Sequence, residues 1–595
     1  MSHLAHDPLA SSRPEGPTRI GVAIRRAFAK GYTREALIAD INAGAVVAIV
    51  ALALSMALAI AIGVDPQHGL YSAIVAGIVV ALTGGSKFQI SGPSATFIVT
   101  LVPVVAKYGL SGALLVGAMA GALLILMGLA KLGRLIQYIP YPVTTGFTVG
   151  VAVVIASLQL KDALGLVLAE KPDSFTDGIV DFWQARHTAS WSEFCVAAST
   201  LILLLGAPKY LKRIPAPLIA LGTAAIVAFV VSHFFPHVHI ATIGNSFHTT
   251  VLGTTYEGIP RLPPRPVLPW AHLHMSMRLI RELFPSAFAI AMLAAIESLL
   301  SAVVSDGMRG TRHDPNAELV GLGLGNIAAS FFGGIAATGA LARTATNVRL
   351  GARSPLSSVF HSITILLSIL LFAPLVSRVP MASLAALLLV VAWNMADVPH
   401  LLRIVRISPK SDRLVFATCF TLTVFFDMVM AISIGVVISA LLFMRRMAEL
   451  TQTRPVQESI ADSEDEIRAL PRAIAIYEVA GPLFFGAAQN AMNALTSVHA
   501  DTRVVIVDLA HAPAIDASGV VALESAFAQL YRNKQRAILA GPLPEPRSVF
   551  ERADLSRAYI VGSRTEAIAL ARDLVENHLM PDGPPSRSQV PPPVR

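Results

Sequence analysis

Two short segments interrupt the apolar pattern of the chain at corresponding places in its two halves: "GGSKFQISGPSATFIVTLVPVV" and "GGIAATGALARTATNV". Each begins with Gly-Gly and reaches a kink of small residues, Ser91-Gly92-Pro93 or Thr338-Gly339, before a short helical run. A helix that begins inside a protein leaves backbone N–H groups unpaired at its positive end, and such an end binds anions. Paired interruptions of this kind are typical of a midplane site in an inverted repeat. The pattern predicts an anion site between two half-helices.

Side chains near both kinks suit the same chemistry. Ser94 and Thr96 offer hydroxyl donors on one side, and Arg343 offers a fixed positive charge on the other. The alternative for the small residues is close helix packing. The alternative for an arginine is snorkelling to the interface, and we assign that role to Arg349 and Arg353. An arginine at membrane depth is costly, so we favour a functional role for Arg343.

A carboxylate occupies the middle of another apolar segment, "FAIAMLAAIESLLSAVVSDG". Glu297 and Ser301 are four residues apart and therefore share one helical face. A lone glutamate in hydrocarbon is expected to be neutral unless a cation pairs with it. Glu297 is thus a candidate proton carrier, with Ser301 beside it. The alternatives are a structural hydrogen bond or a permanent pair with Arg343.

Weaker polar candidates also lie in the apolar segments. We expect each of them to make a structural contact, mostly an interhelical hydrogen bond, rather than to bind substrate: Gln159, Glu318, Asn326, His361 and Asp427.

The composition is that of a membrane protein. Hydrophobic residues make up 54% of the 595 residues and charged residues only 14%, against about 25% charged in a soluble domain. Apolar runs such as residues 43–64 approach or exceed the roughly 20 residues that a spanning helix needs. The net charge of +8 could suggest a nucleic-acid partner, but basic cytoplasmic loops explain it better. The two cysteines and the absence of ligand spacing predict neither a metal nor a cofactor.

Changes in composition divide the chain. We expect a cytoplasmic N-terminal lead over residues 1–34, a transmembrane domain over 35–450, an acidic linker over 451–470, an α/β domain over 471–577 and a disordered Pro-rich tail over 578–595. The apolar block fits about fourteen crossings of roughly 20 residues. An even number of crossings with a cytoplasmic N-terminus places most basic clusters on one side. Those clusters are Lys131 and Arg134, Lys209 to Arg213, Arg309 and Arg312, Arg403 to Arg413, and Arg445 with Arg446.

The C-terminal part alternates strand and helix patterns, as in "RVVIVDLAHAPAIDASGVVALESAFAQLYRNK". Asp516 and Ser518 lie where a helix begins, so either could cap it. The sequence shows no nucleophile–base pair, phosphate loop or metal cluster here, which favours a regulatory or interaction domain over an enzyme.

The chain resembles the SulP (sulfate permease) anion transporters over nearly its whole length, and its end resembles a STAS domain. The opening "DINAGAVVAIVALALSMALAIAIGVDPQHGLYSAIVAGIVVALTGGS" carries the first likeness, and "AIDASG" matches the STAS motif in which a serine is phosphorylated in anti-sigma-factor antagonists. The resemblance implies fourteen transmembrane helices in a 7+7 inverted repeat, with core and gate subdomains, and a homodimer. It implies an anion held between the third and tenth helices. The matching positions, with two from the first helix, are Ser94, Ala95, Thr96, Gly339, Ala340, Leu341, Ala342, Arg343, Ser55 and Leu58.

Within that family the chain is most similar to the bacterial C4-dicarboxylic acid transporter type. The segments "AMLAAIESLLSAVVSDGMRGTRHDPNAELVGLGLGNI", "ARTATNVRLGARSP" and "AALLLVVAWNM" carry this likeness. It implies proton-coupled uptake of succinate, fumarate or aspartate in the bacterial inner membrane, with both termini cytoplasmic. Cyanobacterial bicarbonate members have an aspartate for sodium at the position of Glu297, so glutamate favours protons. The same type brings in acyl carrier protein as a candidate partner of the STAS domain.

Other functions fit parts of the pattern. A transporter or exchanger of sulfate or bicarbonate could use the same site, and so could an uncoupled anion channel, against which Glu297 argues. A membrane-tethered sensor would bind the anion without net flux. Nucleobase transport is disfavoured by Arg343 and by the attached STAS domain.

Overall fold

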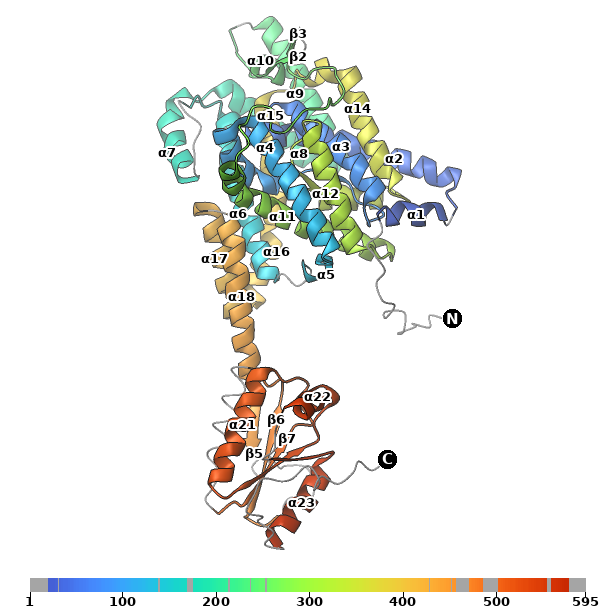
Figure 1. Ribbon diagram of the computed structural model, residues 1–595. Coiled ribbons are helices and arrows are strands. Elements are labelled where there is room, and N and C mark those ends of the chain that lie inside the picture. Colours follow the sequence, from blue (N-terminus) through green and yellow to red (C-terminus); the bar gives the residue numbers. More distant parts are fainter. Residues whose placement is uncertain are drawn as a thin grey trace. The chain divides into compact units, whose positions relative to one another are not determined.

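The computed structural model describes residues 20–29, 31–136, 140–168, 175–211, 215–235, 237–251, 254–426, 428–450, 452–455, 470–484, 501–553 and 558–576. Asp427, residues 1–19, most of the acidic linker and the tail lie outside the described residues. The chain forms two compact units, Met1–Val436 and Val437–Arg595. Figure 1 labels their helices and strands.

The first unit is mostly helical. Its helices are α1 (Val22–Ala29), α2 (Arg34–Ile62), α3 (Pro66–Thr83), α4 (Ile98–Leu129), α5 (Gly133–Ile136), α6 (Tyr141–Leu164), α7 (Phe175–Ala185), α8 (Trp191–Tyr210), α9 (Ala216–Phe234), α10 (Ile243–Ser246), α11 (Met277–Arg309), α12 (Pro315–Phe331), α13 (Leu341–Arg349), α14 (Leu356–Val376), α15 (Met381–Ala396), α16 (Val398–Ile407) and α17 (Lys410–Phe425), and α18 (Met428–Leu450) runs on into the second unit. Short 3₁₀ turns η1 (Ala95–Phe97) and η2 (Arg186–Thr188), and strands β1 (Ser91–Pro93), β2 (His248–Val251), β3 (Thr254–Glu257) and β4 (Ala337–Gly339), complete it.

Ten helical stretches among the described residues are long and apolar enough to cross a membrane. One of them, the stretch Ala95–Leu129, contains a break at Gly109, whose φ of 63° and ψ of −162° are not helical. Glycine adopts such a left-handed φ without the steric cost of a Cβ. The expected number of fourteen crossings stays a prediction.

The longer helices of the first unit, together with α13, pack in two groups. In the core group α12 lies against α3 and α4, α14 against α2 and α3, and α11 against α4 and α13. In the gate group α15 and α17 lie against α6, and α8 against α9 and α15. Small residues allow close approach within the core group: a Cβ on Gly121 of α4 would lie 2.7 Å from the carbonyl oxygen of Gly323 on α12.

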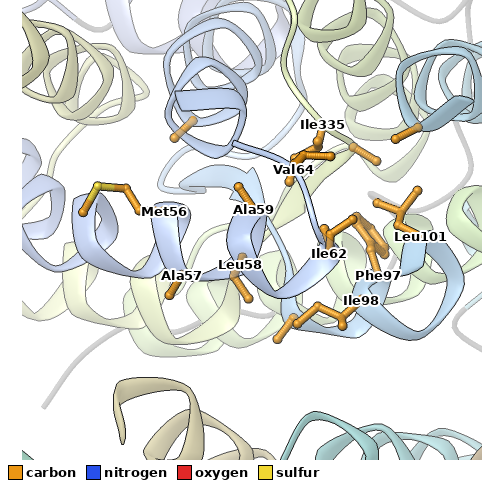
Figure 2. Close-up of a cluster of buried hydrophobic side chains, with 14 of the residues drawn as sticks. Met56, Ala57, Leu58, Ala59, Ile62, Val64, Phe97, Ile98, Leu101 and Ile335 are labelled. Atoms are coloured by element: carbon orange, nitrogen blue, oxygen red, sulfur yellow. The ribbon is translucent and has the colours of Figure 1, made fainter. Parts of the chain in front are cut away.

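A buried apolar cluster supports the start of α4. Figure 2 shows Phe97, Ile98 and Leu101 beside Ile62 near the end of α2. Phe97, Ile98 and Leu101 have no exposed surface. A fully buried aromatic or aliphatic side chain contributes about 1.5–3 kcal/mol through the hydrophobic effect. These contacts fix the first turn of the half-helix against α2.

The second unit is an α/β domain with one five-stranded sheet in the order β5-β6-β7-β8-β9. Its elements are β5 (Gln452–Pro455), β6 (Ile474–Ala480), β7 (Val504–Asp508), α21 (Ala517–Arg532), β8 (Arg536–Ala540), α22 (Pro544–Arg552), β9 (Ala558–Val561) and α23 (Arg564–Glu576). Strands β6 to β9 are parallel and β5 is antiparallel to β6. Helices α21 and α22 contribute to one buried cluster and α23 to another, as expected for a parallel sheet covered on both faces.

Candidate functional site

The two interrupted segments that the sequence singles out meet in the core group. Strands β1 and β4 pair antiparallel, with Ser91 opposite Gly339 and Gly92 opposite Thr338. All six residues of the two strands are buried. The pairing satisfies backbone groups that could find no water at this depth. Residues separated by almost 250 positions in the sequence are therefore held side by side.

A helix begins directly after each strand. Turn η1 and α4 follow Ser94, and α13 follows Ala340. Neither Ser94 nor Ala340 caps its helix with a side-chain hydrogen bond. Neither helix start is neutralised by a capping side chain of its own, and each carries partial positive charge. The arrangement can bind an anion between the two helix starts.

Glu297 of α11 lies beside the start of α4. Ser94 Oγ donates to Glu297 Oε2 at 2.8 Å, and the Oγ atoms of Ser94 and Thr96 are 2.9 Å apart. Glu297 is half-buried, and Ser94 is half-buried as well. The candidate proton carrier is therefore in direct contact with Ser94, one of the two candidate anion donors that precede α4.

Arg343 of α13 reaches the paired strands β1 and β4, which form the strand crossing. Its side chain is 5% exposed, and Nη2 donates to the carbonyl oxygen of Pro93 at 2.5 Å. Gly92 makes this approach feasible, because a Cβ there would lie 2.5 Å from Arg343 Nη1. Nε and Nη1 have no hydrogen-bond partner among the described residues. Buried guanidinium donors normally have acceptors, so these two N–H groups suit an anion.

The other predicted residues fall at different places around the crossing. Ser301 and Ser55 are fully buried, and neither Oγ has a hydrogen-bond partner in the described part of the chain. Leu58 lies in the apolar cluster of Figure 2 and is 1% exposed. Leu341 and Ala342 in the first turn of α13 are exposed, and Ala95 and Thr96 in η1 are buried.

Two buried polar side chains hold strand β4 in place. Asn326 on α12 bonds both backbone groups of Ala337, with Nδ2 to the carbonyl oxygen at 2.9 Å and Oδ1 to the N–H at 2.8 Å. Thr338 Oγ1 donates to the carbonyl oxygen of Ala294 on α11 at 2.9 Å. Asn326 is a polar residue in an apolar helix, and for that reason the sequence suggests a structural hydrogen bond. The bond is made to strand β4 and not to another helix.

Three more of the weaker candidates can be compared with their expected roles. Glu318 accepts from the N–H groups of Gly85 and Ser86, in the non-helical segment between α3 and β1. It also accepts from Ser298 Oγ of α11 at 3.4 Å, and this contact is the expected interhelical hydrogen bond. His361 is fully buried, and neither ring nitrogen has a partner among the described residues. The expectation of an interhelical hydrogen bond is therefore not met for His361. Gln159 is buried in α6.

In the α/β unit the helix cap belongs to Asp516. Its Oδ1 accepts from the N–H of Gly519 at 2.8 Å, and its φ and ψ are those of extended backbone. Ser518 lies in the first turn of α21 and is half-buried. In the ranges that the structure describes, no group of three or more His, Cys, Asp or Glu side chains could hold a metal ion.

Comparisons with known proteins agree with this architecture. The profile of the Sulfate permease family matches residues 37–419, and that of the STAS domain matches residues 466–567. The putative sulfate transporter YvdB of Bacillus subtilis is 38% identical over 88% of this chain and 95% of its own length. The bicarbonate transporter BicA of Picosynechococcus is 29% identical over 87% and 90%. The inward-facing structure of murine Solute Carrier 26 family member A9, an anion transporter, superposes with a TM-score of 0.78 at 18% identity, over 93% of this chain and 94% of the other.

Proposed function

The chain belongs to the sulfate permease family and is a multi-pass membrane anion transporter with a C-terminal STAS domain, and we propose that it is a proton-coupled importer of C4-dicarboxylates. The observation that supports the proposal is the contact between Ser94 at the start of α4 and Glu297 on α11. Arg343 adds two unpartnered donors at the same crossing. An anion and a proton can therefore bind at adjoining groups.

The proposed coupling follows from charge balance. An anion between two helix starts and Arg343 is attracted by positive charge, whereas an ionised Glu297 close by repels it. A proton on Glu297 removes that repulsion, so anion and proton are expected to bind together and to leave together. Ser94 can donate to the carboxylate in the empty state and turn its hydroxyl to the anion once Glu297 is protonated.

The proposed movement is an elevator-like shift of the core group against the gate group. Glu297 lies on α11, Arg343 lies on α13, and Ser94 directly precedes η1 and α4; these three helices all belong to the core group. The site can therefore move as one body without breaking its own contacts, and alternating access requires only that the two groups slide against each other.

The proposed orientation places both termini in the cytoplasm of a bacterial cell. Basic side chains make local contacts at one end of the core group. Arg26 Nη1 donates to the carbonyl oxygen of Arg312 at 3.4 Å, Arg309 Nη2 to that of Val348 at 2.9 Å, and Arg353 lies 3.9 Å from Glu35. The positive-inside rule assigns this end to the cytoplasm. A homodimer and binding of acyl carrier protein by the STAS domain stay predictions.

A second candidate function is transport of sulfate or bicarbonate. It is favoured by the names of the relatives, which include a putative sulfate transporter and a bicarbonate transporter. Uptake of labelled succinate into proteoliposomes, with and without an inward proton gradient, tests both functions. Competition by fumarate and aspartate supports the dicarboxylate proposal. Absence of succinate uptake together with uptake of sulfate or bicarbonate refutes the dicarboxylate proposal and supports the second function.

A further inference from the structure

A second carboxylate, Glu318 of α12, is fully buried behind the strand crossing. Its Oε2 accepts from the N–H groups of Gly85 and Ser86 at 2.9 and 2.8 Å. Its Oε1 accepts from Gln89 Nε2 at 2.7 Å and from Ser298 Oγ at 3.4 Å. In all four contacts the partner donates and the carboxylate accepts. An ionised carboxylate has no donor of its own, so these contacts suit the ionised form. Charge-assisted bonds of this kind are roughly twice as strong as neutral ones.

Gln89 carries this contact to the two strands of the crossing. It lies two residues before β1, and its Nε2 also donates to Ser298 Oγ, next to Glu297 in the chain. The same side-chain amide packs against Gly339, the last residue of β4. A Cβ on Gly339 would lie 2.0 Å from Gln89 Nε2. One carboxylate is thus connected to the segment before β1, to α11 beside Glu297 and to the end of β4.

We propose that Glu318 is a positioning residue of the anion site: its ionised carboxylate, acting through Gln89, fixes the distance between the two half-helix starts. This inference rests on the proposed function, because the site that it positions is the proposed anion site. Binding groups must be held within about 0.5 Å of their working geometry by such supporting contacts. Loss of the acceptor at Oε1 leaves the amide of Gln89 unpaired. Loss of the charge also weakens the bonds that the N–H groups of Gly85 and Ser86 make to this side chain, so the segment before β1 is expected to move.

The test compares E318Q, Q89A and the double variant in full-length protein reconstituted in proteoliposomes, with labelled succinate and labelled sulfate as probes. Glutamine keeps the volume of Glu318 but removes its charge and turns one acceptor toward Gln89 into a donor. We expect each single variant to raise KM about tenfold, with the maximal rate nearly unchanged. The double variant is expected to be no worse than the more affected single one, because both residues act through one contact. The pH dependence of uptake is expected to stay that of the wild type.

The matched control is E282Q. Glu282 is an exposed carboxylate in the first part of α11 that pairs with Lys107 and Arg278 at 3.0 Å. Its replacement should leave KM unchanged. An unchanged KM in folded E318Q and Q89A overturns the proposal, and so do additive effects in the double variant. Loss of the pH dependence in E318Q would make Glu318 a proton carrier instead and equally overturns the positioning role.

Hydrogen–deuterium exchange separates this proposal from the transport proposal. Exchange at residues 85–97 is expected to be faster in E318Q than in the wild type, and this holds whether or not the vesicles take up either probe. If the wild type moves neither succinate nor sulfate while E318Q loosens residues 85–97, the transport proposal fails and the positioning contact stands. If exchange in that segment is unchanged in E318Q, the positioning proposal fails.

Discussion

Substitution of Gly339 by alanine tests whether the strand crossing sets the geometry of the anion site. The new Cβ would lie 2.0 Å from Gln89 Nε2 and 2.4 Å from its Cδ. Ordinary contacts between heavy atoms begin near 3.5 Å. The side chain of Gln89 and the strand β4 must therefore separate by about 1.5 Å, the difference between about 3.5 Å and the 2.0 Å contact.

Either response to that overlap harms the site. If Gln89 moves away, its bond to Glu318 at 2.7 Å is lost, and a buried group without its partner costs about 1–3 kcal/mol. If β4 moves, α13 and Arg343 move with it, and a misplacement of about 1 Å can cost about a hundredfold in rate. We expect G339A to lower substrate affinity by about ten- to a hundredfold, since about 1.4 kcal/mol corresponds to a factor of ten.

The assay is concentration-dependent uptake of labelled succinate by reconstituted G339A, with thermal unfolding measured in parallel. The matched control is G222A in α9, where a Cβ meets no atom within 4 Å and where alanine is the better helix former. Wild-type affinity in G339A would refute the reasoning. Equal losses in G339A and G222A would also refute it, because the control disturbs no contact.

Three further predictions use separate parts of the structure. R343Q is expected to lower anion affinity at least about tenfold, since charge-assisted bonds are lost; unchanged succinate competition would contradict the placement of Arg343. Burial, together with its hydrogen bond to Asp40, raises the pKa of Tyr32 to about 12, so at neutral pH its hydroxyl is protonated and donates to Asp40 at 2.7 Å. Y32F is therefore expected to destabilise the protein by about 1 kcal/mol, seen as a lower Tm; an unchanged Tm would count against the bond. D516A removes the cap of α21 at a cost of about 1 kcal/mol, and hydrogen exchange at residues 517–520 should accelerate; unaltered exchange would argue that the cap is not formed.

The sequence identifies the two interrupted segments, because their signals are local, although it does not predict that they pair as strands. Gly-Gly, the small-residue kinks and the helical runs after them are all visible within segments of about twenty residues. Their meeting at one site follows from the inverted repeat. The register of Ser91 opposite Gly339 is a finding of the structure. So is the contact of Ser94 with Glu297, two residues that the sequence singles out separately.

The supporting contacts could not be predicted in the same way. Glu318 and Gln89 are 229 positions apart, and their contact depends on how α12 packs against α3 and α4. Periodicity places Glu318 on a helix but does not say which backbone it reaches. The two unpartnered nitrogens of Arg343 are likewise a property of the packed structure, because a sequence shows a charge but not its neighbours.

The most direct test of the central claim, that the half-helix crossing binds an anion together with a proton on Glu297, is proton-driven accumulation of labelled succinate by E297Q in proteoliposomes. Glutamine keeps an oxygen that accepts from Ser94 but cannot exchange a proton. The account predicts that the wild type accumulates succinate in response to an inward proton gradient and that E297Q only equilibrates it. Accumulation by E297Q to the wild-type level under the same gradient would contradict the claim.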